Sequence, residues 1–178
     1  RFDPIGNRIA ATNAGEAFSY AANALNQYTS IVDGGAVTPS YDDDGNMVSL
    51  GVWTYVWDAE NRLAVATDGS VSVTNVYDYM SRRIAKATAT EARSFLYDGW
   101  NLIREVALAG GVLSTNFYVW GPDLSGTLQG AGGVGGLIAV IRDGVPYFAA
   151  YDANGNVTEY VAPHGTGVAH FESEPFGN

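Results

Sequence analysis

After Asp68-Gly69, Val71, Val73, Asn75 and Tyr77 alternate with Ser72, Thr74, Val76 and Asp78, so that the two sets face opposite ways with a period of two. This period is typical of a half-buried β-strand, and Asp-Gly between two such segments is a strong signal for a tight hairpin. Similar turn signals stand at Asp43-Asp44-Gly45, Gly110-Gly111 and Asp143-Gly144. The pattern therefore predicts a series of antiparallel hairpins and an all-β fold.

An aromatic residue followed by an acidic residue recurs along the chain, close to many of these turns. Three copies begin at Trp57, Tyr77 and Tyr97, so consecutive copies are 20 residues apart. A unit of this length holds two strands and two turns and cannot bury an apolar face alone, so neighbouring units must stack. The residues that we assign to the repeated motif are Tyr41, Asp42, Gly45, Trp57, Asp58, Tyr77, Asp78, Tyr97, Asp98, Tyr151, Asp152 and Gly155.

Each position of the motif has a physical role. The aromatic residue ends one strand and packs on the adjacent unit, so we expect these rings to be largely buried. The aspartate can accept hydrogen bonds from backbone N–H groups two residues further on. Glycine, or asparagine in its place, tolerates the left-handed backbone of a tight turn, which predicts a positive φ at Gly45 and Gly155.

The array is predicted to cover the whole chain, residues 1–178, with regular hairpins from 41 to 178 and a glycine-rich connection at 130–136. Residues 9–40 are irregular or degenerate, and the alanine-rich segment from Ala10 to Glu16 is expected to be a loop or a short helical turn. Degenerate motif copies begin at Phe2, Asn23 and Ser173. Because the first of them opens the chain, we expect the sequence to be an excised piece.

These copies resemble the YD-repeat or Rhs-repeat family, whose pattern is Tyr-Asp-x-x-Gly-Asn/Arg. The segments 97–105 and 118–123 and the closing Glu174-Pro175-Phe176-Gly177-Asn178 also resemble family signatures. Members include bacterial toxin-complex subunits, Rhs toxins and the animal teneurins. The resemblance covers essentially the whole chain.

The resemblance implies a fold, partners and a location. The fold would be part of a β-sheet ribbon that spirals into a hollow shell around a C-terminal toxin polypeptide. The partners would be the remaining repeats and the C-terminal cargo of the same polypeptide, and the protein would be secreted by a bacterium or held at its surface. The aspartate-dependent self-cleavage of bacterial members is not expected here, because Asp3-Pro4-Ile5-Gly6 is only a degenerate motif copy.

Composition narrows the function further. The formal net charge is −10 and Lys86 is the only lysine, which argues against a nucleic-acid partner because phosphates require clustered Lys and Arg. The chain has no apolar run of about 18 residues and therefore no predicted membrane span. Cysteine is absent, which excludes thiol catalysis and cysteine metal sites.

Acidic residues at the turns also suggest calcium. Asp42, Asp44 and Asn46 alternate as in a calcium loop, and residues 152, 154 and 156 repeat the pattern. The glycine and the late bidentate glutamate of an EF-hand are missing, with Met47 and Trp53 in their places. Turn chemistry explains the same residues, so no metal or other cofactor is predicted.

Two further candidate sites remain. The glycine run at 130–136 lacks the Lys-Ser/Thr of a phosphate-binding loop and precedes a predicted strand instead of a helix. His164 and His170 flank a glycine turn and could hold a metal with Glu172 or Glu174, although such residues are more often solvated strand positions.

The sequence therefore leads to one main hypothesis and two alternatives. The chain is expected to be a structural segment of a toxin shell and not an enzyme. In the first alternative, rows of exposed aromatic rings bind carbohydrate or a neighbouring cell. The second, a hydrolase, is disfavoured because no catalytic constellation stands outside the repeat. Exposed sheet edges also predict self-association.

Overall fold

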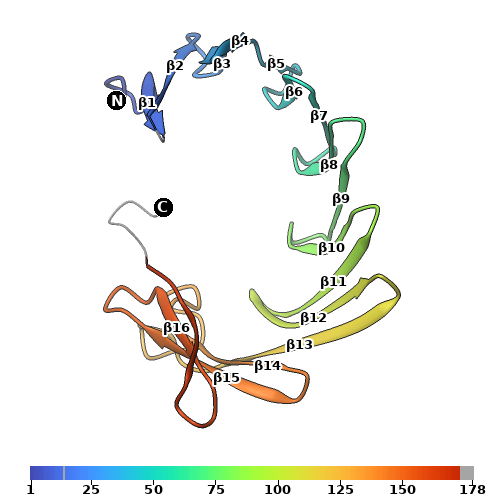
Figure 1. Ribbon diagram of the computed structural model, residues 1–178, viewed down its shortest axis with the longest axis vertical. Coiled ribbons are helices and arrows are strands. Elements are labelled where there is room, and N and C mark those ends of the chain that lie inside the picture. Colours follow the sequence, from blue (N-terminus) through green and yellow to red (C-terminus); the bar gives the residue numbers. More distant parts are fainter. Residues whose placement is uncertain (14, 173–178) are drawn as a thin grey trace. The chain divides into compact units, whose positions relative to one another are not determined.

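The computed structural model describes residues 1–13 and 15–172, and these ranges contain seventeen β-strands and no helix (Figure 1). The strand pairs of the described residues are antiparallel and join strands that are consecutive in the sequence, as the hairpin pattern predicts. The predicted all-β, antiparallel fold is therefore confirmed. The last motif copy, which begins at Ser173, lies outside the described residues.

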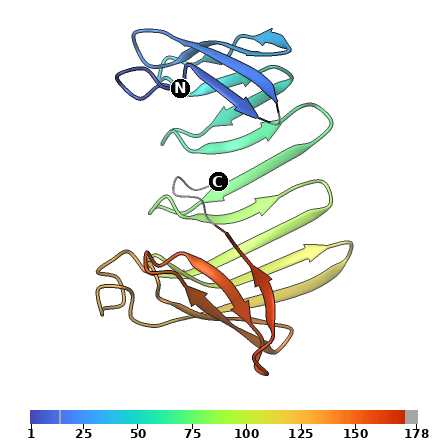
Figure 2. The same ribbon diagram turned by 60° about the vertical axis from the view of Figure 1, so that its left-hand side comes forward.

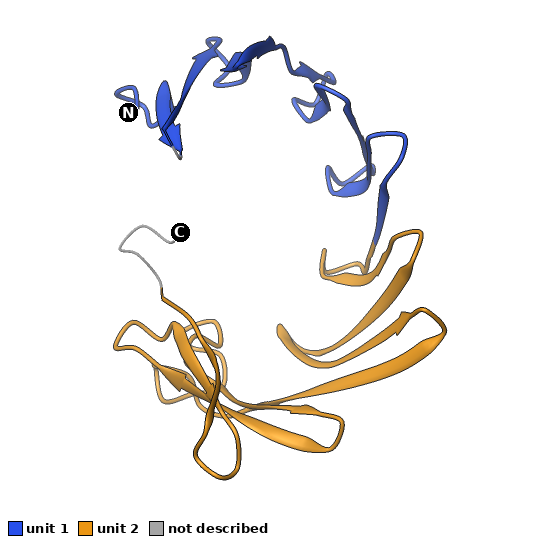
Figure 3. Cartoon of the chain, viewed as in Figure 1, with its two compact units in different colours: residues 1–75 blue, residues 76–178 orange. Residues whose placement is uncertain are grey.

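The chain forms two compact units, residues 1–75 and residues 76–178 (Figure 3). In the first unit, one sheet has the order β1-β2-β3-β4 and the next begins with β5-β6-β7-β8-β9. The strands of these sheets are β1 (Ala10–Asn13), β2 (Glu16–Ala22), β3 (Tyr28–Asp33), β4 (Gly35–Val37), β5 (Ser40–Tyr41), β6 (Met47–Leu50), β7 (Trp53–Trp57), β8 (Leu63–Thr67) and β9 (Ser72–Tyr77). Pro39 stands between the two sheets, where the missing N–H of proline cannot extend a ladder of hydrogen bonds.

The second unit continues with the same up-and-down order, and Figure 2 shows its hairpins side by side. Its strands are β10 (Arg83–Ala87), β11 (Glu91–Asp98), β12 (Asn101–Ala109), β13 (Val112–Trp120), β14 (Leu137–Arg142), β15 (Val145–Tyr151), β16 (Val157–Val161) and β17 (Gly167–His170). Strands β11, β12 and β13 are the longest and pair along most of their lengths.

The alanine-rich segment is a strand, which corrects the expectation of a loop or helical turn. Residues 10–13 form β1, and Ala10 to Asn13 pair in register with Ser19 to Glu16 of β2. A helix this short is marginal even in alanine-rich sequences, whereas pairing with β2 satisfies the backbone of the segment. The hairpin pattern therefore extends into residues 9–40.

The predicted turns are confirmed at Asp43-Asp44-Gly45, Asp68-Gly69 and Asp143-Gly144, each of which joins two paired strands. Gly45 has φ 87° and Gly155 has φ 81°, so the predicted left-handed backbone is confirmed at both.

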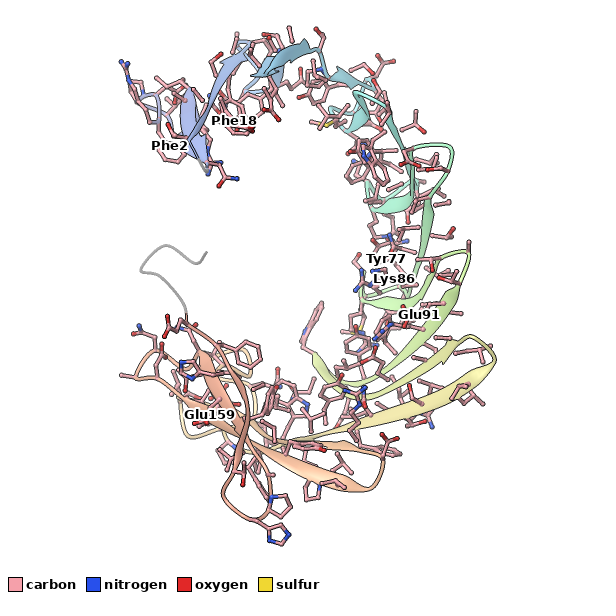
Figure 4. All side chains as sticks on the ribbon, in the orientation of Figure 1. Phe2, Phe18, Tyr77, Lys86, Glu91 and Glu159 are labelled. Carbon is pink, nitrogen blue, oxygen red and sulfur yellow. The ribbon has the colours of Figure 1, made fainter. Side chains whose placement is uncertain are left out.

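Within each unit the strands follow one another in a sheet, and side chains stand on both of its faces (Figure 4). Among the described residues, Ala107 and Ala139 are the buried apolar ones, and no large side chain is fully buried. The expectation of largely buried motif rings was therefore wrong. The half-buried motif aromatics are Tyr41, Trp57, Tyr77, Tyr97 and Tyr151. Tyr41, Trp57, Tyr97 and Tyr151 each donate a hydrogen bond to a backbone carbonyl of an earlier strand, and none of the five rings is fully buried.

Residues 1–13 and 15–172 contain no helix that is long and apolar enough to cross a membrane.

Candidate functional site

A repeated turn, here called the clasp, holds many of the motif residues. In the Asp42 clasp, Oδ1 accepts the backbone N–H of Asp44 over 3.1 Å and that of Asn46 over 2.8 Å. Oδ2 accepts the side-chain Nδ2 of Asn46 over 3.1 Å. Gly45, the third residue after the aspartate, supplies the positive φ. One carboxylate thus satisfies donors across the entire turn, and these bonds, led by that from the Asn46 side chain, lower the pKa of Asp42.

The same geometry recurs around Asp3, Asp58, Asp78 and Asp152. The residue four positions after the aspartate is asparagine in some clasps and arginine in others. Where it is arginine, Nε donates to the aspartate over 2.8 Å, from Arg62 to Asp58 and from Arg82 to Asp78.

A neutral version of the clasp stands in the degenerate copy at Asn23. Its Oδ1 accepts the backbone N–H of Leu25 over 2.9 Å and of Gln27 over 3.0 Å, while its own Nδ2 donates to Gln27. Asn26, in place of glycine, has φ 62°. Asparagine can therefore replace both the aspartate and the glycine of the motif.

Asp98 departs from the motif prediction. The chain turns through only two residues between β11 and β12, so Asp98 is paired with Asn101 across the strands, and Gly99 has φ 56° at the turn. Because this turn is shorter, the residues two and four positions further on do not curl back over the carboxylate. Among the described residues, no clasp hydrogen bond to Asp98 forms, and Trp100 at the tip is 61% exposed.

The motif aromatics connect neighbouring hairpins through their polar atoms. Trp57 donates its indole N–H to the carbonyl oxygen of Met47 over 2.8 Å, and Trp120 does the same to Leu102 over 2.7 Å. Tyrosines use their hydroxyl groups in this way, each bonding to a carbonyl at or near the start of an earlier strand. The tyrosine pairs are Tyr41 with Tyr28, Tyr97 with Arg83, and Tyr151 with Leu137.

A register shift precedes the motif aromatic in four hairpins, between residues 40 and 41, 56 and 57, 96 and 97, and 150 and 151. A bulge changes the direction of a side chain and increases the local twist. The bulge and the carbonyl hydrogen bond therefore act together to place each ring.

The glycine-rich connection is a compact loop built around Asp123, which is 6% exposed. Oδ1 accepts the backbone N–H and the hydroxyl of Ser125, and Oδ2 accepts the N–H of Ala131 over 2.7 Å and of Gly133 over 3.1 Å. The hydrogen bond from the Ser125 hydroxyl and the three backbone donors lower the pKa of Asp123 to about 2. These backbone donors point at the protein's own carboxylate instead of at a phosphate.

The candidate metal positions are arranged for other contacts. Both oxygens of Asp42 and of Asp152 already accept N–H groups in their clasps. His170 lies opposite Glu159 in the β16–β17 register, whereas His164 is in the turn, so the two histidines do not face each other. Glu174 lies outside the described residues. Within residues 1–13 and 15–172, no group of three His, Asp or Glu side chains could hold a metal ion.

A buried carboxylate network spans β11, β12 and β13 of the second unit. Glu105 is 7% exposed, pairs with Arg93, and accepts the hydroxyl of Tyr118 over 2.7 Å. Glu91, labelled in Figure 4, pairs with the same arginine. Burial opposes ionisation of Glu105, but the hydrogen bonds from Tyr118 and Arg93 outweigh it and lower its pKa. Burial and the bond to Glu105 raise the pKa of Tyr118.

An open cleft of about 600 Å³ lies beside this network in the second unit. Direct cross-strand neighbours Tyr118, Val140 and Tyr147 line it, and the strands curl so that Tyr160 of β16 also reaches it. The other lining residues are Asn116, Arg142, Asp143, Val168 and Ala169. Its aromatic lining with a few polar groups makes it a candidate binding site.

Comparisons with known proteins add a relationship in sequence. No family model matches the chain. Curated relatives include tRNA3(Ser)-specific nuclease WapA of Bacillus spizizenii and tRNA nuclease WapA of Bacillus subtilis strain 168, each 30% identical over 99% of the chain. The tRNA(Glu)-specific nuclease WapA of Bacillus subtilis subsp. natto is 30% identical over 88%. These relatives are tRNA nucleases by name. The chain spans only about 7% of the length of the first two and 6% of the third.

Solved structures of bacterial toxins also match. The Photorhabdus luminescens Tc holotoxin pore has a TM-score of 0.49 at 12% identity, over 100% of this chain and 13% of that chain. A TcdB2–TccC3 crystal structure has a TM-score of 0.47 at 10% identity, over 99% of this chain and 15% of that chain.

The relatives contradict the prediction that the chain is not an enzyme, because proteins that align with 99% of it are named nucleases. That prediction rested on the turn roles of the acidic residues and on the lack of a known catalytic motif. Neither argument accounts for similarity to nucleases along nearly the whole chain. The predicted absence of a nucleic-acid partner rested on charge alone and stays a prediction.

Sequence reasoning missed the buried carboxylates Glu105 and Asp123. Glu105 follows Ile103 and precedes Ala107 at two-residue steps on one face of β12, so an acidic residue interrupts an apolar series. That interruption was the available signal. For Asp123 the only local signal was Ser125, two residues further on, because its other partners, Ala131 and Gly133, are distant in sequence and donate only backbone N–H groups.

Proposed function

We propose that this chain is a β-hairpin repeat segment of a longer bacterial toxin that cleaves tRNA, and that it forms part of a shell that encloses or displays the toxin polypeptide. The similarity to WapA nucleases along 99% of the chain supports the first half of the proposal. The clasp supports the shell half of the proposal. Its hydrogen bonds are local to each turn, so the same hairpin can be repeated many times along one β-sheet ribbon. Secretion or display at the cell surface follows from the same proposal.

The wall of such a shell would be the single-layer sheet. Each clasp fixes the end of a hairpin, and each motif aromatic ties its hairpin to an earlier strand through a backbone carbonyl, as Trp57 does with Met47. Both kinds of bond lie within the sheet, so the wall needs no second layer to hold its register. Both faces stay available, one toward the enclosed polypeptide and one toward solvent.

The test uses the full-length protein that contains this chain. We expect it to cleave tRNA weakly in native buffer and more strongly after mild denaturant opens the shell. The Asp152→Ala variant, which removes a clasp, should release activity at lower denaturant and expose the toxin polypeptide to protease sooner. Asp98→Ala, which removes an aspartate outside a clasp, is the matched control and should behave like the parent protein.

Two results would overturn the proposal. Absence of tRNA cleavage with and without denaturant would remove the nuclease half. Equal protease sensitivity of the toxin polypeptide in the parent, Asp152→Ala and Asp98→Ala proteins would remove the shell half.

A further inference from the structure

Arginine side chains stacked on aromatic rings are a recurring contact in this chain. The guanidinium carbon of Arg82 lies 5.2 Å from the ring centre of Tyr97, and that of Arg83 lies 5.4 Å from the ring centre of Phe95. A third such pair, Arg8 over Phe2, stands in the first unit at 5.7 Å. Arg82 is also held by the carboxylate of Asp78 over 2.7 Å. In this chain, an aromatic ring face together with a carboxylate therefore forms a binding site for an arginine side chain.

The cleft of the second unit also combines tyrosine rings with a carboxylate, and its own arginine, Arg142, is not stacked on those rings. Tyr147 and Tyr160 present half-buried rings, and Tyr160 is steadied by the edge-on ring of Phe171 at 6.0 Å. The exposed carboxylate of Asp143 stands at the lining. No arginine of the described residues is stacked on either tyrosine.

Asn116 also lines the cleft and lies directly opposite Glu105 in the β12–β13 register. Its Oδ1 is buried and has no hydrogen-bond partner among the described residues, so the groups open to a ligand are the two tyrosine rings and Asp143.

We propose that this cleft binds an arginine side chain of a peptide segment, with the guanidinium on the Tyr147 and Tyr160 rings and its N–H groups directed to Asp143. Guanidinium is planar, carries several donors and stacks on aromatic faces, whereas a lysine ammonium is compact and strongly hydrated. The net charge of −10 favours a basic segment. Arg142 also lines the cleft and is the one lining charge that opposes the guanidinium.

The test uses the intact 178-residue chain and two small probes in an NMR titration. N-acetyl-arginine N-methylamide should bind in the millimolar range and shift the resonances of Tyr147 and Tyr160. The citrulline analogue, a neutral isostere, should bind at least tenfold more weakly. Asp143→Asn should weaken binding of the arginine probe severalfold, and Arg142→Gln should strengthen it severalfold. Both side chains are exposed, so neither change threatens the fold.

Asp98→Asn is the matched control, since this exposed carboxylate is not part of the cleft, and it should leave the affinity unchanged. Equal binding of the arginine and citrulline probes would overturn the proposal. So would binding of N-acetylglucosamine at the same tyrosines in the absence of any arginine effect, which would make the cleft a sugar site. These outcomes do not depend on whether the longer protein cleaves tRNA.

Discussion

Tyr118 on β13 donates its hydroxyl hydrogen to Oε2 of Glu105 on β12 over 2.7 Å, and Arg93 on β11 pairs with the same carboxylate. One carboxylate therefore ties three consecutive strands together. It can remain ionised at 7% exposure only because both partners are in place. In a sheet with so few fully buried apolar side chains, this polar contact adds side-chain links to the backbone pairing of the longest strands.

Removal of the Tyr118 hydroxyl should destabilise the chain. Tyr118→Phe leaves the buried Glu105 carboxylate without one donor, so we expect the free energy of unfolding to fall by about 1–3 kcal/mol. Tyr147→Phe is the control, because its hydroxyl makes no hydrogen bond with the described residues, and it should cost less than about 0.5 kcal/mol. Urea unfolding of both variants gives the comparison. Similar losses in the two variants would show that the hydroxyl of Tyr118 is not essential to the network.

Two clasp glycines should respond differently to alanine. Both have positive φ, so Gly45→Ala should cost about 1–2 kcal/mol from backbone strain alone. At Gly155 the new Cβ would also lie 2.7 Å from Val134 and 2.9 Å from Leu124 of the Asp123 loop. Gly155→Ala should therefore lose a further ~1–3 kcal/mol from overpacking. Thermal or urea unfolding measures both, and equal losses would mean that the loop does not rest on this clasp.

Much of the fold could be predicted from the sequence because the hairpin turns depend on residues that are close together in the chain. The turn at Asp68-Gly69 and the positive φ of Gly45 depend on residues within a few positions of each other. The half-burial of the motif rings depends instead on whether a second layer exists, and alternation along a strand is the same with or without one. At Asp98 the residues of the motif are present, but the chain forms a two-residue turn in place of the clasp.

The candidate site was beyond sequence reasoning for a similar reason. The cleft brings together residues from β13 to β17, and its position depends on how the second unit curls. The Asp123 loop depends on backbone donors, which any residue except proline provides. Side-chain identity carries no information about these backbone contacts, so the glycine run at 130–136 predicted a connection but not the close approach of Gly136 to the backbone of Gly121 and Gly133.

Asp123 should make stability depend on pH in the acid range. Its pKa is about 2 in the folded chain and about 3.9 in an unfolded one, so the stabilisation is fully present above the unfolded value. As pH falls from about 4 toward 2, the unfolded state takes up the proton first and the stabilisation is lost. Asp123→Asn replaces an acceptor by an amide donor that faces other N–H groups, so it should be less stable than the parent at neutral pH.

Urea unfolding at several pH values tests this expectation. The gap between the parent and Asp123→Asn should be constant above about pH 5 and should narrow as pH approaches 2. Asp98→Asn, at an exposed carboxylate outside any clasp, serves as the control and should show a small gap at every pH. A gap at Asp123 that is the same at pH 2.5 and pH 7 would mean that the variant destabilises by packing and not by loss of the charge.

The hydrogen bond from the Trp57 indole to the Met47 carbonyl should make a measurable contribution to the free energy of unfolding. Trp57→Phe keeps most of the ring but removes the N–H that the Met47 carbonyl accepts over 2.8 Å, so we expect a loss of about 1 kcal/mol beyond the effect of the smaller ring. Trp53→Phe is a matched control on the same strand β7, because its indole N–H makes no hydrogen bond with the described residues and it is half-buried as well. The difference between the two variants in urea unfolding therefore isolates the hydrogen bond from the change in ring size. If the two losses were equal, packing of the ring alone would connect the hairpins, and any large aromatic residue would serve at the motif position.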